Sequence, residues 1–379
     1  MFNLGFISGS PAKVVTPSII PAFTPNNLID AGYNWSPSQV STPRLAEFVA
    51  MTKGAAYTWG LNNIVGTTGA DNTQPKPAGN TLAIPGFNWR NIALQLQAAG
   101  AQYCILTVAT AFGWSLFDCK TAWPLTPSIV TGTGTFATNW PSGLLIPYYN
   151  KYDVQQSYNP NTFQDFCYEM RNVGIEPIIY NPIHADIIRL GGLITDGQPT
   201  AIVNAFILFF CLWLQELIIR YGIRYFWLDG PSYGNVNGFM QKIYNAVKSV
   251  TGQNNENECL IIANALPGNE AADWPYDIRA FEYFIYGGNP AIFNRTLNIN
   301  GTNYYVPVNM VECCAQNNYY YNIKPGLPGQ GVLTNFSQSY LQAEKTLTET
   351  YNASFCLFLQ PDYLGNMLPS QLTLLQGLT

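Results

Sequence analysis

The stretch Tyr221-Gly222-Ile223-Arg224-Tyr225-Phe226-Trp227-Leu228-Asp229-Gly230 decides the fold class of this chain. Gly222 is a typical helix terminator, and the apolar residues after it predict a short buried strand over 225–228. Asp229 ends that strand. Catalytic residues of parallel α/β barrels gather at the carboxyl ends of the strands. Asp229 is therefore the first candidate for a chemical role.

The same order of elements recurs along the chain: a helix, a glycine, an apolar strand and a polar loop. The apolar spacing predicts helices over 89–99, 162–173, 201–221, 238–250 and 339–352. It predicts strands over 55–60, 103–108, 176–180, 225–228, 260–263 and 355–359. Repeated βα units of this kind favour an α/β fold with a parallel sheet. Residues 1–43, rich in Pro, Ser and Thr, are predicted to form an extended arm.

Composition excludes several classes of function. Charged residues make up only 10% of the 379 residues, and the net charge is −5 with no cluster of Lys or Arg. Nucleic-acid binding needs such a cluster, so no nucleic-acid partner is expected. The longest apolar run, Ala205–Leu214, is too short to cross a bilayer and predicts a buried helix rather than a membrane span. The N-terminus lacks the basic and apolar segments of a secretory signal.

No metal and no cofactor is expected from the motifs in the sequence. His184 is the only histidine, and no cluster of Asp or Glu at ligand spacing accompanies it. Neither a dinucleotide-binding glycine motif nor a phosphate-binding loop occurs. The eight cysteines are scattered without a C-x-x-C pair, and several lie inside apolar runs. That pattern favours buried free thiols over a disulfide framework.

Six segments, in order from about Leu45 onward, resemble the catalytic barrel of the α-L-fucosidase family of glycoside hydrolases. They are Tyr57-Thr58-Trp59-Gly60-Leu61, GAQYCILTVATAFGWSLFDCK (100–120), Arg171–Tyr180, Tyr221–Gly230, Glu312-Cys313 and FCLFLQPDYLGNMLP (355–369). The resemblance implies a single-domain (β/α)8 TIM-like barrel over residues 44–379 and a carbohydrate ligand. It places the family's nucleophile at Asp229. The family's C-terminal β-sandwich has no counterpart in this sequence.

The sequence also departs from the family pattern. Thr58 stands where the family's first strand has a histidine, and Thr110 and Ala111 stand where the family has a His-His pair. These histidines grip the sugar hydroxyls in the family. The resemblance therefore predicts the barrel more strongly than it predicts recognition of fucose, because a fold does not establish a function.

Three carboxyl groups are candidates for catalysis. Retaining glycoside hydrolysis needs two, about 5–5.5 Å apart, one to attack the anomeric carbon and one to protonate the leaving oxygen. Asp229 is the candidate nucleophile, and the alternative is an Asp that caps the turn at 231–234. Glu282 is the first candidate acid/base, with an ion pair to Arg279 as the alternative. Glu312, in an apolar stretch where a partner must hold it, is the second.

Aromatic and polar side chains near the predicted strand ends are candidates for contact with a sugar. The aromatic candidates are Trp59, Trp114, Trp227 and Trp274, and the polar candidates are Thr58, Thr110 and Asn264. Aromatic residues make up 14% of the chain, so core packing is the alternative explanation for each of them.

The composition also indicates a biological context. Few charges, abundant Asn, Thr and Tyr, and a Pro-rich arm resemble a component of a virion or another assembly. We expect neighbouring protein subunits as partners and an extracellular or virion-associated location. Two functional hypotheses follow. One is a retaining exo-glycosidase of altered specificity, and the other is a catalytically inactive structural or glycan-binding protein that keeps the barrel.

Overall fold

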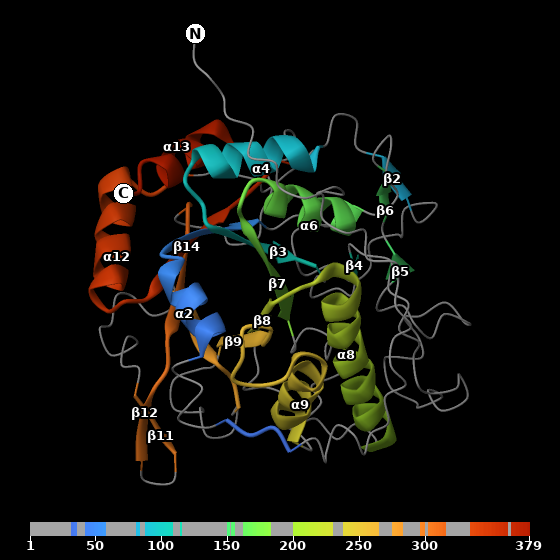
Figure 1. Cartoon of the computed structure of the whole chain (residues 1–379). Coiled ribbons are helices and arrows are strands. Elements are labelled where there is room, and N and C mark those ends of the chain that lie inside the picture. The colour runs from blue at the N-terminus through green and yellow to red at the C-terminus, as the bar shows by residue number, and fades with distance from the viewer. Residues whose placement is uncertain are drawn as a thin grey trace.

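Eight parallel strands close a barrel in the order β1-β14-β13-β10-β9-β8-β7-β3 (Figure 1). The computed structural model describes residues 32–35, 42–57, 81–83, 88–108, 114–115, 150–151, 153–155, 162–182, 200–229, 238–264, 275–282, 296–299, 302–315, 334–362 and 365–379. The barrel strands are β1 (Lys53–Tyr57), β3 (Tyr103–Thr107), β7 (Glu176–Pro182), β8 (Tyr225–Asp229), β9 (Leu260–Asn264), β10 (Ile278–Glu282), β13 (Val308–Cys313) and β14 (Ser354–Leu359). The predicted (β/α)8 barrel is confirmed.

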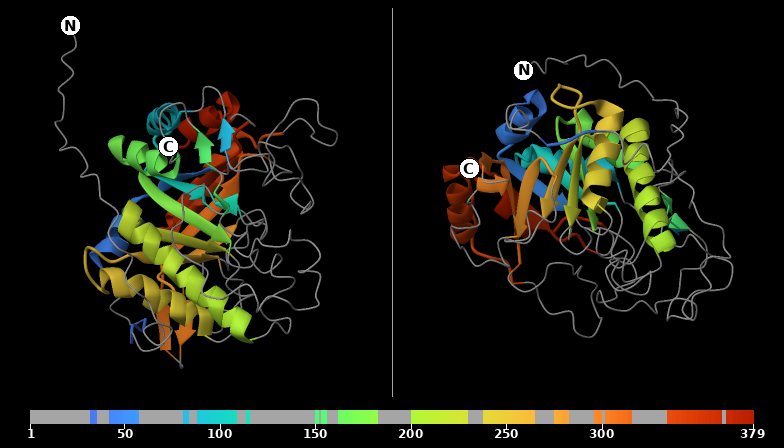
Figure 2. Two further views of the ribbon diagram at one scale, coloured as in Figure 1. Left: turned by 90° about the vertical axis from the view of Figure 1, so that its right-hand side faces the viewer. Right: turned by 90° about the horizontal axis from the view of Figure 1, so that it is seen from below.

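Helices cover the outside of the barrel, as Figure 2 shows from two further directions. They are α2 (Pro43–Ala50), α4 (Trp89–Ala98), α6 (Thr162–Asn172), α8 (Thr200–Tyr221), α9 (Phe239–Thr251), α12 (Gln338–Thr350) and α13 (Pro369–Gln376). Short pairs lie outside the barrel: β2 (Thr81–Ala83) with β6 (Asp153–Gln155), β4 (Trp114–Ser115) with β5 (Asn150–Lys151), and β11 (Thr296–Ile299) with β12 (Thr302–Tyr305). Among the described residues, none of the helices has the length and apolar character needed to span a membrane.

Glycines end the predicted helices where the sequence places them. Gly100, Gly174 and Gly222 follow α4, α6 and α8 with φ of 77°, 78° and 64°. Glycine adopts this left-handed conformation without the steric cost that a Cβ brings. All five predicted helices are present. The extended arm predicted over residues 1–43 stays a prediction, because residues 1–31 and 36–41 lie outside the described residues.

Two barrel strands and two helices are absent from the sequence prediction. Polar residues interrupt the apolar pattern of both strands, Arg279 and Glu282 in β10 and Asn309 and Glu312 in β13. The helix α2 begins at Pro43, and Thr42 caps it by accepting a hydrogen bond from the backbone N of Leu45 at 3.2 Å. The other missed helix is α13.

Alternation along the strands divides the core into two layers. Residues such as Tyr225 and Trp227 face the barrel axis, whereas Phe226 and Leu228 pack beneath the helices. Phe48 of α2 joins the inner layer, and its ring centroid lies 5.6 Å from that of Tyr225. Because Tyr225 is the first residue of β8, α2 closes the end of the barrel where the strands begin.

Gly54 leaves the space that the Tyr103 ring occupies inside the barrel. A Cβ built at position 54 would approach that ring to 2.1 Å. We expect Gly54→Ala to lower the free energy of unfolding by about 1–3 kcal/mol, since the ring must shift within a packed interior. Urea unfolding measures the loss. The loss should disappear in a Tyr103→Ala background, and an equal loss in both backgrounds would contradict this explanation.

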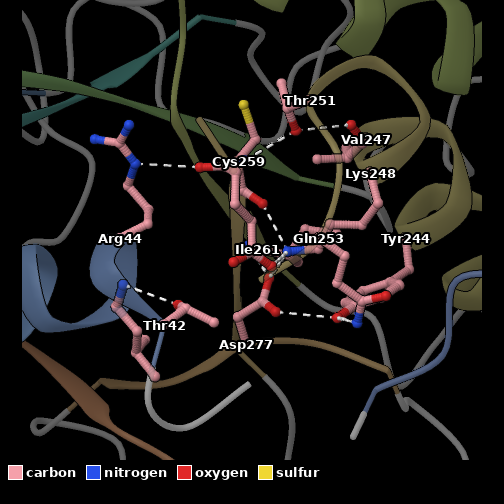
Figure 3. Close-up of polar contacts among 12 residues, drawn as sticks. Thr42, Arg44, Tyr244, Val247, Lys248, Thr251, Gln253, Cys259, Ile261 and Asp277 are labelled. Atoms are coloured by element: carbon pink, nitrogen blue, oxygen red, sulfur yellow. Dashed lines mark hydrogen bonds and ion pairs between the residues drawn. The ribbon is translucent and has the colours of Figure 1, made fainter. Parts of the chain in front are cut away.

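A buried ion cluster lies between α9 and the beginnings of β9 and β10 (Figure 3). Nζ of Lys248 is 2.6 Å from Oε1 of Glu258 and 3.0 Å from Oδ2 of Asp277. It also donates to the backbone O of Cys259 at 2.7 Å. The side chains of Lys248 and Glu258 are completely buried. This cluster lies at the opposite end of these strands from Asn264 and Glu282, their last residues.

Candidate active site

Four consecutive barrel strands bring polar side chains to the carboxyl end of the barrel. Tyr180 lies on β7, Asp229 on β8, Asn264 on β9 and Glu282 on β10. Each keeps the alternation of inward residues on its own strand, such as Trp227 before Asp229. The register of β8 with β9 sets Asp229 directly opposite Asn264. The structure therefore groups three residues predicted from the sequence with a tyrosine that was not predicted.

Asp229 is held by a hydrogen bond to each carboxylate oxygen. The hydroxyl of Tyr180 donates to Oδ2 at 2.6 Å, and Nδ2 of Asn264 donates to Oδ1 at 2.8 Å. The residue is 8% exposed. Donors of this kind fix the orientation of a carboxylate and satisfy it near an apolar interior.

A cavity opens beside these residues at the mouth of the barrel. Its volume is about 20 Å³, and its lining residues are Ala56, Ile105, Thr107, Tyr180, Trp227, Glu282, Val311 and Phe358. Glu282 and Asp229 lie on strands separated only by β9. Neighbouring strands are about 4.8 Å apart, and inward side chains of a barrel converge on its axis. The geometry brings these two carboxyl groups to the same side of the sheet.

Glu312 lies on the other face of the barrel wall. Its neighbour Val311 lines the cavity, so alternation turns Glu312 outward toward α12. Oε1 accepts from the backbone N of Cys313 at 2.6 Å, and Oε2 accepts from the hydroxyl of Tyr340 at 3.4 Å. Of the two candidate acids, the structure favours Glu282, because Glu312 does not share the cavity.

The pH dependence of stability should reveal the position of Glu312. Burial, followed by the nearby charge of Glu344, raises the pKa of Glu312 to about 7, while hydrogen bonds from Cys313 and Tyr340 oppose the shift. The folded protein then keeps a proton that the unfolded chain has released. The stability from this group is complete below its unfolded pKa and is lost as the pH rises through 7.

We therefore expect Glu312→Gln to unfold at higher urea concentration than the parent above about pH 7, by up to about 3 kcal/mol, with the gain absent below about pH 4.5. Glu349→Gln makes the same charge change on α12 at a side chain that is 36% exposed. This control should show no comparable gain. A gain for Glu312→Gln that is the same at both pH values would contradict the assignment.

Trp227 forms the floor of the cavity. It is 2% exposed and stacks on Tyr180, with ring centroids 5.1 Å apart and an interplanar angle of 26°. Its Nε1 donates to Oδ1 of Asn309 at 3.1 Å. The indole is thus fixed in place below the site, and only part of it is left for contact with a ligand.

Several predicted contacts fall on parts of the chain that the structure leaves out. Trp59, Thr58, Thr110 and Trp274 lie outside the described residues, and Trp114 is described only as a backbone position in β4. Within the described residues no group of three His, Cys, Asp or Glu has the geometry to hold a metal ion. The seven cysteines among them are free and buried, as the sequence predicts, and burial raises the pKa of the Cys104 thiol well above its usual value.

Solved structures of α-L-fucosidases have the same fold. The α-L-fucosidase AlfC from Lactobacillus casei, in complex with its α-L-fucose product, is 15% identical, with 88% of this chain and 96% of that chain covered and a TM-score of 0.59. An α-L-fucosidase GH29 from Bacteroides thetaiotaomicron is 12% identical, with 89% and 72% covered and a TM-score of 0.60. No family model and no curated protein matches the sequence. At these identities the likeness concerns the fold, and the chain has the barrel fold of the α-L-fucosidases.

Proposed function

We propose that this chain is an α-L-fucosidase-like glycoside hydrolase barrel that acts as a retaining exo-glycosidase of altered specificity. One observation carries the proposal: the carboxylate of Asp229 stands at the carboxyl end of β8, oriented by Asn264 and by Tyr180, which lines the cavity together with Glu282. Retaining glycoside hydrolysis uses a pair of carboxyl groups at one site, one as the nucleophile and one as the acid/base.

The reaction divides into two displacements. Asp229 attacks the anomeric carbon while Glu282, in its acid form, gives its proton to the glycosidic oxygen, which leaves as an alcohol. Glu282 then removes a proton from water, and the resulting hydroxide displaces Asp229 from the glycosyl ester with net retention. Tyr180 and Asn264 hold the carboxylate for attack and stabilise it when it leaves.

The sugar is proposed to differ from fucose. Thr58, Thr110 and Ala111 replace the histidines that grip the sugar hydroxyls in the family that the sequence resembles. The described wall of the cavity opposite the polar strands is largely apolar, with Ala56, Ile105 and Phe358. Among the described strands, β7, β8, β9 and β10 therefore supply most of the groups that could hydrogen-bond a ligand.

The same replacements favour one second candidate function, a catalytically inactive structural or glycan-binding protein. In either case we propose neighbouring subunits of a virion or other assembly as partners and an extracellular or virion-associated location. The low charge content and the Pro-rich N-terminal segment support this context.

A covalent trap tests the proposed function. The protein is incubated with 2-deoxy-2-fluoro-glycosyl fluorides of several sugars, and peptic peptides are analysed by mass spectrometry. We expect one sugar to add a single glycosyl group to Asp229, and water to release it slowly. If neither an adduct nor turnover of the matching aryl glycosides occurs, the enzyme hypothesis fails. Binding to a glycan array would then support the inactive alternative.

A further inference from the structure

A chain of hydrogen bonds crosses the interior of the barrel below the cavity. Nε1 of Trp227 donates to Oδ1 of Asn309, and Nδ2 of Asn309 donates to the hydroxyl of Tyr103 at 2.9 Å. That hydroxyl is 2.8 Å from Oγ of Ser354, which donates to the backbone O of Met51 at 2.6 Å. The four side chains come from β8, β13, β3 and β14, so the bonds connect opposite walls of the barrel.

The donors of this chain all point the same way. An indole N–H can only donate, so Oδ1 of Asn309 must face Trp227, and its amide group is left to face Tyr103. Ser354 uses its proton on Met51, so Tyr103 supplies the proton of the bond between the two hydroxyls and shares it with the backbone O of Phe355 at 3.1 Å. The side-chain amide of Asn309 therefore has a single orientation, and its hydrogen bond from Nε1 of Trp227 fixes the position of the indole. Each bond in such a row polarises the next.

Trp227 transmits this position to the candidate nucleophile. Its ring stacks on Tyr180, whose hydroxyl donates to Oδ2 of Asp229. Asn309 is completely buried, and among the described residues these two rings connect it to the site. A shift of the indole would move the tyrosine, and with it the donor that orients the carboxylate.

We propose that Asn309 is a positioning residue for Asp229, acting through Trp227 and Tyr180. The inference rests on the proposed function and extends it to a residue two strand positions below the cavity. An asparagine at this place does what an apolar residue of the same size cannot, because it accepts from the indole and donates to Tyr103 at once. Its role is to orient the carboxylate from below.

The test uses the full chain and three variants. Asn309→Leu removes the bonds to Trp227 and Tyr103, and a longer one to the backbone O of Ser354, at nearly constant volume. Trp227→Phe keeps a ring against Tyr180 but loses the bond to Asn309. Ser354→Ala is the matched control, since it breaks the same chain at its foot and leaves the bond between Trp227 and Asn309. Two resonances are followed by NMR: the indole ¹H–¹⁵N pair of Trp227 and the ¹³C carboxyl of Asp229, assigned with Trp227→Phe and Asp229→Asn.

We expect the Asp229 carboxyl resonance to shift in Asn309→Leu and in Trp227→Phe, and to stay in place in Ser354→Ala. With the aryl glycoside of the sugar that labels Asp229, Asn309→Leu should lose about 10–100-fold in kcat with KM within about threefold, because the nucleophile is displaced. A merely structural role would affect Asn309→Leu and Ser354→Ala alike. The proposal is overturned if folded Asn309→Leu or Trp227→Phe leaves the carboxyl resonance unmoved. The carboxyl resonance is measured without substrate. The positioning role of Asn309 can therefore fail or hold independently of the proposed hydrolase activity.

Discussion

Asp229→Gly is expected to lower kcat/KM for the best aryl glycoside by about 10⁴-fold or more, because the covalent route loses its nucleophile. The variant should fold, since Asp229 is the last residue of its strand. Asn264 and Tyr180 lose one acceptor each, but both lie at the open mouth, where water replaces it. Stopped assays of aryl release measure the loss.

Azide distinguishes a lost nucleophile from a damaged site. A small anion can enter the space that the carboxylate leaves and attack the anomeric carbon from the same side. Activity of Asp229→Gly should therefore return with added azide, and the product should be a glycosyl azide of inverted configuration. Full activity of the variant without azide would exclude Asp229 as nucleophile.

Comparing variants of Glu282 and Glu312 tests which of the two glutamates is the general acid. Glu282→Gln should slow glycosides with poor leaving groups far more than activated aryl glycosides, because only the former need the proton. Glu312→Gln should keep the activity of the parent within about threefold, since Glu312 faces α12 and not the cavity. A reversed order would return Glu312 to the role of the acid.

The sequence predicts most of the barrel because its strands are short, apolar and followed or preceded by glycines. Strands such as β3 and β8 are buried on both faces and read as continuous apolar runs. The pattern fails at β10 and β13, where Glu282 and Asn309 face the barrel interior. Polar residues that serve the site or its support thus break the signal that locates the strand carrying them.

The candidate site is predictable only in part for a related reason. Asp229 is found from sequence because it ends an apolar strand and matches a family motif. The choice between Glu282 and Glu312 depends on which face of the sheet each side chain takes, and a shift of one residue reverses that face. Tyr180 is the last residue of the strand predicted over 176–180, although β7 continues to Pro182, and this position was the available signal for its role. Asn309 has no such signal, since its partner Trp227 lies 82 residues away.

The second large predicted effect is on the stability of the barrel, and it concerns the seam between β9 and β10, that is, the line along which these two strands are hydrogen-bonded. β9 and β10 pair through two residue pairs, Ile278 with Ile262 and Arg279 with Ala263, whereas every other pair of neighbouring barrel strands has four or five. Asp277 extends the seam with its side chain, because Oδ2 accepts from the backbone N of Ile261 at 2.8 Å. Lys248 holds that carboxylate in place from α9.

Lys248→Met is expected to lower the free energy of unfolding by about 3–5 kcal/mol, because it leaves two buried carboxylates without their cation. Methionine fills much of the space, so lost packing is not the main cause. Lys242→Met, on the same helix at a half-buried position, should cost no more than about 0.5 kcal/mol. Urea unfolding compares the two variants with the parent.

The location of the damage separates this explanation from a general loss of stability. Hydrogen exchange in Lys248→Met should rise first at the amides of β9 and the start of β10, because the weakened contact joins those segments. Adding Glu258→Gln and Asp277→Asn should restore part of the loss, since the uncompensated charges are then removed. A triple variant no more stable than Lys248→Met alone would mean that packing around the lysine stem, and not the ion cluster, closes this seam of the barrel.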